Sequence, residues 1–172
     1  MSTRRGQYVS LREIIDEVGV DAARFFFLMR GINAHLDFDL ELAKKQTPEN
    51  PVYYVQYAHA RVHSVNKKAK ESNTVIADKN FTRFKEPEEL ELIKSLGTFP
   101  DILEVCYNQL DPNPLVSYLQ EVASGFHRFY DCHRVVSEDA QLSAERLGLA
   151  NAVRVVLANG LKILGLNAPE QM

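Results

Sequence analysis

The sequence has 172 residues, which is long enough to bury a substantial hydrophobic core. Its composition, 45% hydrophobic and 25% charged residues, is ordinary for a globular protein. Twenty basic and 23 acidic residues give a net charge of -3, so overall charge does not indicate nucleic-acid binding and any such site has to be a local patch. Cys106 and Cys132 show no metal-ligand spacing to a histidine cluster. No apolar run of the kind found in signal peptides follows the N-terminal residues, so we expect no secretory signal. The longest apolar run, 25–29, is too short to cross a membrane. We therefore expect a soluble, cytoplasmic chain with two reduced cysteines.

The N-terminal part predicts a loop followed by two short helices. Residues 1–9 are small, polar and basic, which is typical of a loop. Ser10 and Glu13 have the spacing of a capping box at the start of a helix that Gly19 can end. A second helix is expected over residues 21–31. It is apolar nearly all round, which predicts burial on more than one side.

The stretch from Asn50 to Arg61 reads Asn-Pro-Val-Tyr-Tyr-Val-Gln-Tyr-Ala-His-Ala-Arg and combines a helix start with three tyrosines. Asn50 can cap the helix, and Pro51 suits its first turn because the missing N–H would have no partner there. We expect the helix to continue to about Lys70. Apolar residues at three- and four-residue steps predict one buried face: Val52, Val55, Ala58, Val62 and Val65.

Four aromatic or basic side chains of this helix fall largely off the apolar stripe: Tyr53, Tyr54, Tyr57 and Arg61. Such side chains, held partly exposed on a helix, suit stacking on unpaired bases and contact with phosphate. The alternative, which composition alone favours, is that the tyrosines lie half-buried between helices with their hydroxyl groups satisfied. The basic residues near the end of the helix also suit the negative end of its dipole: Lys67, Lys68 and Lys70.

The remainder of the chain predicts further helices. Residues 72–85 lack periodicity and predict a long connection, after which Pro87 and Pro100 each mark a helix start. Beyond a break at 111–114, apolar residues at steps of four and three predict a helix that ends near His133: Leu115, Leu119, Val122, Phe126 and Phe129. A last helix stops at Gly165. Because no alternating run suggests a strand, the fold class is all-α, a bundle of six to eight helices.

Motifs of catalysis or metal binding are not evident. The sequence has no Gly-x-x-x-x-Gly-Lys, no Gly-x-Gly-x-x-Gly and no His-Glu-x-x-His. His59 lies between Val55 and Val62, so a hydrogen-bonded core histidine is a better interpretation than a ligand. Asp37 and Asp39 suit helix capping, which leaves a hydrolase built on His59 and these carboxylates as the least favoured hypothesis. We predict a binding module with no complete catalytic site and no metal site.

Several runs together resemble one family, the arginyl-tRNA synthetases, which are class I enzymes that attach arginine to its tRNA. The matching runs are Met1 to Arg4, Tyr8 to Arg12, Glu17 to Phe25, His35 to Leu40, Asn50 to Arg61, and the tail from Asn159 to Met172. The resemblance covers nearly the whole chain and is weakest from about residue 72 to 86. Twelve consecutive residues, from Asn50 to Arg61, make it specific.

This resemblance implies that a Rossmann-type catalytic domain with a His-x-Gly-His signature precedes the segment seen here, which has no such motif. Residues 1–46 would be a remnant of the ATP-binding signature loop with a connecting helical segment. Residues 47–172 would be a helical bundle of the class I synthetase anticodon-binding type. The full-length enzyme would use ATP with magnesium. We expect this C-terminal portion to need no cofactor and to be inactive in aminoacylation by itself.

The signature loop of the family places positive charge against the ATP phosphates as the aminoacyl-adenylate forms. Met1, Ser2, Thr3 and Arg4 match its last four positions. Thr3 stands where the usual pattern has its second lysine, so Arg4, Arg5 or an upstream residue would supply the charge. The alternative is that these residues are a disordered tail of this chain.

For the bundle, the resemblance implies binding to the anticodon stem and loop of tRNA(Arg). Tyr53, Tyr54 and Tyr57 would stack on bases, each stack being worth on the order of 1–3 kcal/mol, with Arg61 near phosphate. Met172 would pack on a base, because the C-terminus lies close to the anticodon loop in family members. A second polar and aromatic group follows at helical spacings: Arg128, Tyr130, His133 and Arg134.

The partners implied are tRNA(Arg) and the catalytic domain of the same enzyme, with no membrane and a monomeric state. The alternative is a helical protein-interaction module of the same ancestry that does not bind tRNA.

Overall fold

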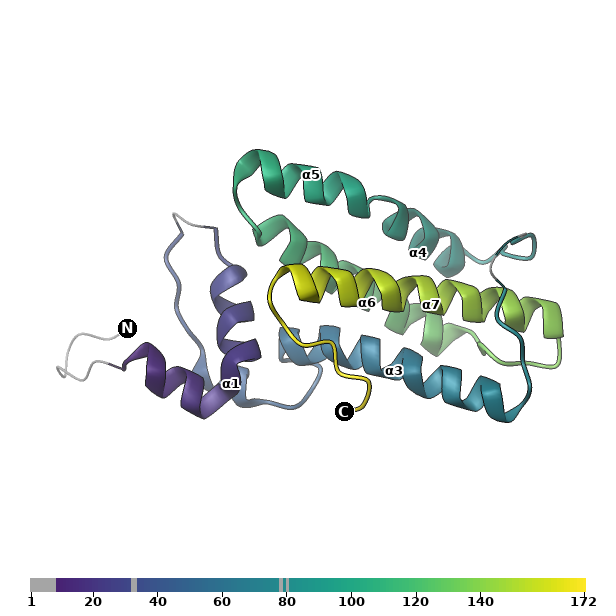
Figure 1. Ribbon diagram of the computed structural model, residues 1–172, viewed down its shortest axis with the longest axis horizontal. Coiled ribbons are helices and arrows are strands. Elements are labelled where there is room, and N and C mark those ends of the chain that lie inside the picture. The colour runs from purple at the N-terminus through teal and green to yellow at the C-terminus, as the bar shows by residue number, and fades with distance from the viewer. Residues whose placement is uncertain (1–8, 32–33, 78, 80) are drawn as a thin grey trace.

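The computed structural model describes residues 9–31, 34–77, 79 and 81–172, and this part of the chain contains helices and connections but no strand (Figure 1). The predicted all-α class is confirmed there. The seven helices are α1 (Leu11–Leu28), α2 (Leu40–Lys44), α3 (Pro51–Glu71), α4 (Pro87–Gly97), α5 (Phe99–Gln109), α6 (Asn113–Cys132) and α7 (Ala140–Ile163).

The long helices α3, α6 and α7 pack on one another and form the centre of the bundle, while α4 and α5 pack along α6 on one side (Figure 1). α1 and α2 lie together at one end, beside the start of α3. The core between the long helices is apolar, and Phe126, Leu119 and Leu157 are fully buried in it. α6 and α7 approach closely because Gly160 has no side chain: a Cβ there would lie 2.5 Å from Leu119 Cδ2.

α1 corresponds to the two helices predicted before residue 31. Ser10 and Glu13 form the predicted capping box, in which the Glu13 N–H donates to Ser10 Oγ at 3.2 Å and the Ser10 N–H donates to Glu13 Oε2 at 2.7 Å. At Gly19 the backbone is non-helical, with φ 82° and ψ 164°, and the helix resumes at once. Glycine permits this positive φ. The predicted burial on several sides is only partial, because Phe25 is fully buried whereas Phe27 is 43% exposed.

The other predicted helix starts and breaks agree with the structure. Asp39 caps α2 by accepting from the Leu42 N–H at 2.9 Å, and Asn50 caps α3 with Pro51 in its first turn. The connection over 72–85 contains no helix in its described residues. These features were predictable because each depends on side chains only a few residues apart.

The N-terminal end of α4 is attached to α7 by a buried ion pair. The Glu89 side chain is 1% exposed and accepts from Arg146 Nε at 2.7 Å. Its other oxygen accepts from the backbone N–H groups of Lys85 and Glu86 at 3.0 and 3.1 Å. Arg146 also donates through Nη1 to the Arg134 carbonyl at 2.9 Å, which links the connection between α6 and α7 to the same pair.

The charge state of Glu89 follows from these contacts. Burial raises the pKa of its carboxyl group, but hydrogen bonds from Arg146 and from the backbone of Glu86 and Lys85 outweigh burial, so the pKa lies below the usual 4.5. The folded state therefore favours the ionised form. The resulting stabilisation is complete above about pH 4.5 and is lost as the pH falls through the lower pKa of the folded chain.

We expect Glu89→Ala to lower the free energy of unfolding by roughly 3–5 kcal/mol, because it leaves the Arg146 guanidinium buried without its partner. Urea denaturation followed by circular dichroism measures this loss. Arg12→Ala is a suitable control, since Arg12 pairs with Asp16 at the surface and its removal should cost less than about 1 kcal/mol. Equal losses in the two variants would contradict a stabilising role for the buried pair.

Candidate nucleic-acid interface

The two aromatic groups predicted from the sequence lie on neighbouring helices, α3 and α6, and meet at Arg61. The rings of Tyr53 and Tyr57 stack with their centroids 5.8 Å apart and an interplanar angle of 10°. The guanidinium carbon of Arg61 lies 4.7 Å from the centroids of both Tyr57 and Tyr130. All four side chains are half-buried, so the cluster forms part of the surface. A cation between two aromatic rings holds both of them in place.

Arg61 makes two polar contacts in addition to these ring contacts. Its Nη2 donates to the Tyr57 hydroxyl oxygen at 2.9 Å, and its Nη1 lies 3.8 Å from Asp131 Oδ1. The sequence placed Arg61 near phosphate, and phosphate contact stays a prediction. In the structure Arg61 organises the aromatic cluster and joins α3 to α6, and the spacing of α3 residues alone contains no sign of that role.

Tyr54 lies differently from its two neighbours. Its ring packs against the core, with its centroid 4.5 Å from that of His127 on α6. His127 is buried, and its Nε2 lies 3.4 Å from the Tyr54 carbonyl oxygen. Burial, together with the nearby Arg61, lowers the pKa of His127. All three tyrosines are half-buried, as the alternative interpretation expected. Tyr54 packs on the core and on His127, whereas Tyr57 contacts both Tyr53 and His127, with its ring centroid 5.8 Å from each, and its hydroxyl accepts from Arg61.

The second predicted group does not act as one unit. Tyr130 joins the Arg61 cluster, but Arg128 and His133 face α4: Arg128 Nη2 lies 3.5 Å from Glu88 Oε1, and His133 Nε2 lies 3.1 Å from Glu88 Oε2. The Arg134 side chain is exposed. It borders a cavity of about 470 Å³ whose lining also includes Lys68, Tyr130 and His133.

The C-terminal tail after α7 crosses α3 (Figure 1), where Gln56 and His59 of α3 contact its backbone. His59 Nδ1 lies 2.8 Å from the Pro169 carbonyl oxygen, and His59 is buried. The prediction of a hydrogen-bonded core histidine is therefore confirmed. Burial lowers the pKa of His59. Met172, at the end of the tail, is 52% exposed.

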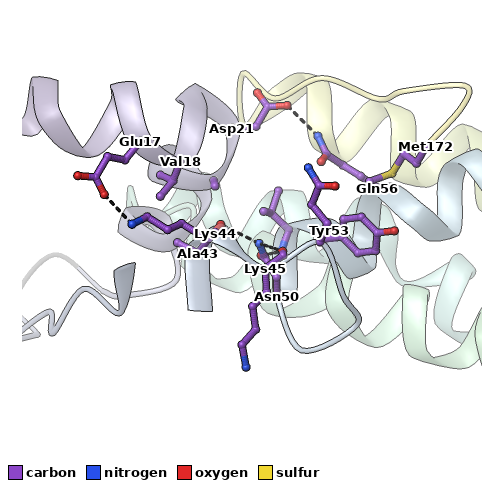
Figure 2. A pocket seen from close by; sticks show the side chains of 13 residues that line it. Glu17, Val18, Asp21, Ala43, Lys44, Lys45, Asn50, Tyr53, Gln56 and Met172 are labelled. Atoms are coloured by element: carbon purple, nitrogen blue, oxygen red, sulfur yellow. Dashed lines mark hydrogen bonds and ion pairs between the residues drawn. The ribbon is translucent and has the colours of Figure 1, made fainter. Parts of the chain in front are cut away.

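Met172 and Tyr53 line the same cavity, which has a volume of about 450 Å³ and lies between α1, α2, the start of α3 and the tail (Figure 2). Its polar lining residues are Glu17, Asp21, Lys44, Lys45, Gln46, Asn50 and Gln56. Sequence reasoning did not identify Gln56, although a polar residue beside Val55 at the edge of the apolar stripe was a usable signal. Figure 2 shows the Gln56 side chain between Asp21 and Met172.

Several predictions about chemistry concern other parts of the chain. Met1, Ser2, Thr3 and Arg4, the predicted signature-loop residues, lie outside the described residues. Among residues that the structure describes, no group of three or more histidine, cysteine or acidic side chains could hold a metal ion. No helix in the described segments is long and apolar enough to cross a membrane. Cys106 and Cys132 are free thiols.

A helical bundle that exposes stacked tyrosines beside an arginine is of the class suited to binding single-stranded RNA. Comparison with known protein families identifies the family within this class. Residues 55–172 match the DALR anticodon binding domain, and the chain belongs to this family.

The chain is similar to curated arginine–tRNA ligases over its whole length. It is 49% identical to the protein from Desulfosudis oleivorans and 50% identical to that from Syntrophotalea carbinolica, covering 100% of this chain and 32% of each relative. It thus spans about a third of the length of these relatives. A crystal structure from Campylobacter jejuni, assigned as an arginyl-tRNA synthetase, matches with a TM-score of 0.84 and 27% identity over 97% of this chain and 36% of that one. Thermus thermophilus arginyl-tRNA synthetase matches with a TM-score of 0.74 and 25% identity over 99% and 29%.

We expect His59 and His127 to titrate in the folded chain with midpoints below 6.5, the ordinary histidine value, because burial disfavours their charged forms. As the pH falls, these histidines therefore bind protons at a higher pH in the unfolded chain than in the folded chain. The free energy of unfolding should thus fall as the pH drops below 6.5. NMR titration of the imidazole resonances measures the midpoints. The same resonances in urea are the control and should titrate near 6.5; folded-state midpoints at or above 6.5 would contradict the prediction.

Proposed function

We propose that this chain is the anticodon-binding portion of an arginyl-tRNA synthetase and that it binds tRNA(Arg) through the face formed by α3, α6 and the C-terminal tail. The observation that carries the proposal is the surface stack of Tyr53 and Tyr57, continued by Arg61 and Tyr130, in a chain of the anticodon-binding family. Curated relatives at 49% and 50% identity are arginine–tRNA ligases, which supports arginine as the amino acid concerned.

The chemistry of the face suits an anticodon loop. Unpaired bases offer flat surfaces that stack on aromatic rings, and each such contact is worth roughly 1–3 kcal/mol. The nearly parallel rings of Tyr53 and Tyr57 provide a platform, and the Tyr53–Met172 cavity offers a recess beside it. Bases stack on the aromatic part, while phosphates interact with basic residues towards the end of α3: Lys67, Lys68 and Lys70, together with Arg134 across the second cavity. The net charge of -3 does not oppose this, since contact needs only a local basic face.

In the longer protein this portion would support the ATP-dependent ligation of arginine to tRNA(Arg), with ATP and magnesium acting in a separate catalytic domain. Residues 1–46 would connect to that domain, and residues 47–172 would form the anticodon-binding bundle. The protein would act as a monomer in the cytoplasm.

We expect Tyr53→Ala to weaken binding of tRNA(Arg) by roughly 5- to 150-fold, the loss that corresponds to one base stack. Tyr57→Ala should weaken binding less, because the Tyr57 ring is covered by Tyr53, Arg61 and His127 and acts by supporting Tyr53. Fluorescence anisotropy with labelled tRNA, at low and moderate salt, measures the affinity. Tyr107→Ala is the matched control, because Tyr107 lies on α5 away from this face, is 78% exposed and should not affect binding. Circular dichroism checks that each variant is folded.

Two results would count against this proposal. One is the absence of any preference for tRNA(Arg) over an unrelated tRNA, and the other is unchanged affinity in both tyrosine variants. Either would favour a helical protein-interaction module of the same ancestry.

Arginine-dependent exchange of pyrophosphate into ATP should be absent from this chain by itself, since its sequence contains no His-x-Gly-His motif of the kind that marks the catalytic domain of the family. The assay uses radiolabelled pyrophosphate on the same preparation that binds tRNA. A full-length arginyl-tRNA synthetase serves as the positive control. Exchange above background by this chain would show that it contains an active site.

A further inference from the structure

A closed set of hydrogen bonds joins α1, α3 and the C-terminal tail. Gln56 Nε2 donates to Asp21 Oδ2 at 2.7 Å (Figure 2) and to the Asn167 carbonyl at 2.9 Å. Asn167 in turn donates to Asp21 twice, from its backbone N–H to Oδ2 and from Nδ2 to Oδ1, both at 3.2 Å. The Asp21 carboxylate therefore accepts from three N–H groups. Gln56 is only 9% exposed, so its two hydrogen bonds are partly shielded from water, whereas Asn167 is exposed.

We propose that Gln56 and Asp21 are positioning residues that hold the C-terminal tail so that Met172 stays beside Tyr53 in the wall of the shared cavity. The inference rests on the proposed function, because it concerns the face that would bind tRNA(Arg). Neither residue needs to touch RNA. Both act through the tail, whose last residue would meet the base.

The tail needs such attachment because it has no regular structure of its own. Residues 166–172 form neither helix nor strand, and ordering each backbone residue costs about 1–2 kcal/mol. Leu166 is buried, and Arg24 of α1 donates to the Gly165 carbonyl, so the start of the tail is also held. Beyond Asn167, the polar contacts are His59 with the Pro169 carbonyl and the distant pair of His63 with Glu170, 4.0 Å apart. Asn167, with three hydrogen bonds, and Pro169, with one, are thus the polar anchors of the tail before the exposed Met172.

Gln56 is placed to couple the tail to the tyrosines. It lies three residues after Tyr53 on α3, so both side chains are on neighbouring positions of one helical face and line the same cavity. Asp21 lines that cavity from α1. A change that releases Asn167 therefore alters the position of Met172 relative to Tyr53 while the stacked rings of Tyr53 and Tyr57 keep their own contacts.

The test is a double-mutant cycle on affinity for tRNA(Arg), using the unmodified chain, Met172→Ala, Gln56→Leu and the double variant. Leu fills much of the Gln56 volume but cannot donate. We expect Met172→Ala to weaken binding in the unmodified chain and to have little further effect once Gln56 is replaced. The coupling should be roughly 2- to 150-fold, the range for residues in one network. An equal effect of Met172→Ala in both backgrounds, or no effect in either, would overturn the inference.

Asn66→Ala is the matched control. Asn66 of α3 exchanges two amide hydrogen bonds of 3.0 Å with Asn151 of α7, away from the tail, so its loss removes the same number of bonds from the same helix. Stability should fall, but the effect of Met172→Ala on affinity should persist. If Asn66→Ala abolished that effect as Gln56→Leu does, the coupling would reflect general destabilisation and the inference would fail.

A second measurement needs no tRNA and separates this inference from the proposed function. In the isolated chain, Gln56→Leu should shift and narrow the methyl NMR signal of Met172, and carboxypeptidase should release Met172 faster than in Asn66→Ala. If the tail is released but the unmodified chain does not bind tRNA, the positioning of the tail stands and the proposed function fails. An unchanged Met172 signal and release rate would overturn the positioning itself.

Discussion

The buried pair of Glu89 and Arg146 is the constraint on which the arrangement of the bundle depends. It is the point where α4, α7, the connection before α4 and the connection after α6 are joined by hydrogen bonds. Removing such a pair of charges from water costs free energy. The pair stabilises the fold only because each charged group is hydrogen-bonded to its partner and to nearby backbone groups. Because Glu89 is held, the adjacent Glu88 faces the end of α6, where it contacts Arg128 and His133. The contact that fixes α4 therefore also orients the part of α6 that carries Tyr130.

The aromatic face depends in turn on the contact between α3 and α6. Arg61 lies between Tyr57 and Tyr130, and a cation over an aromatic ring contributes about 0.5–2 kcal/mol depending on its exposure. Asp131 and the Tyr57 hydroxyl restrict the guanidinium further. The rings are thus ordered before any ligand arrives, which reduces the conformational entropy that binding has to overcome.

Local chemistry explains which features could be predicted from the sequence. The capping box at Ser10, the start of α3 at Asn50 and the interruption of the helix at Gly19 each depend on residues within one helical turn, and all three were predictable. The contacts of the site could not be predicted in the same way. Gln56 meets Asp21 and Asn167 over separations of 35 and 111 residues, and Arg128 meets Glu88 over 40. Periodicity shows which face of a helix is apolar, but not which helix will cover it or which polar group will face it.

The difference between Tyr53, Tyr54 and Tyr57 shows how neighbouring helices divide the roles of like residues. One step along a helix turns a side chain by about 100°, which is enough to place Tyr54 against the core and outside the stack of Tyr53 and Tyr57. The lysines of this part of the molecule also fall into two groups, those with an acidic partner and those without one. Near Tyr53, Lys44 is paired with Glu17 and Lys45 with Glu49, whereas within the described part of the chain the exposed Lys67, Lys68 and Lys70 have no ion-pair partner. Cations without a partner retain more of their attraction for phosphate. The N-terminal half of α3 is therefore suited to contact with RNA bases, and its C-terminal end is suited to contact with RNA phosphates.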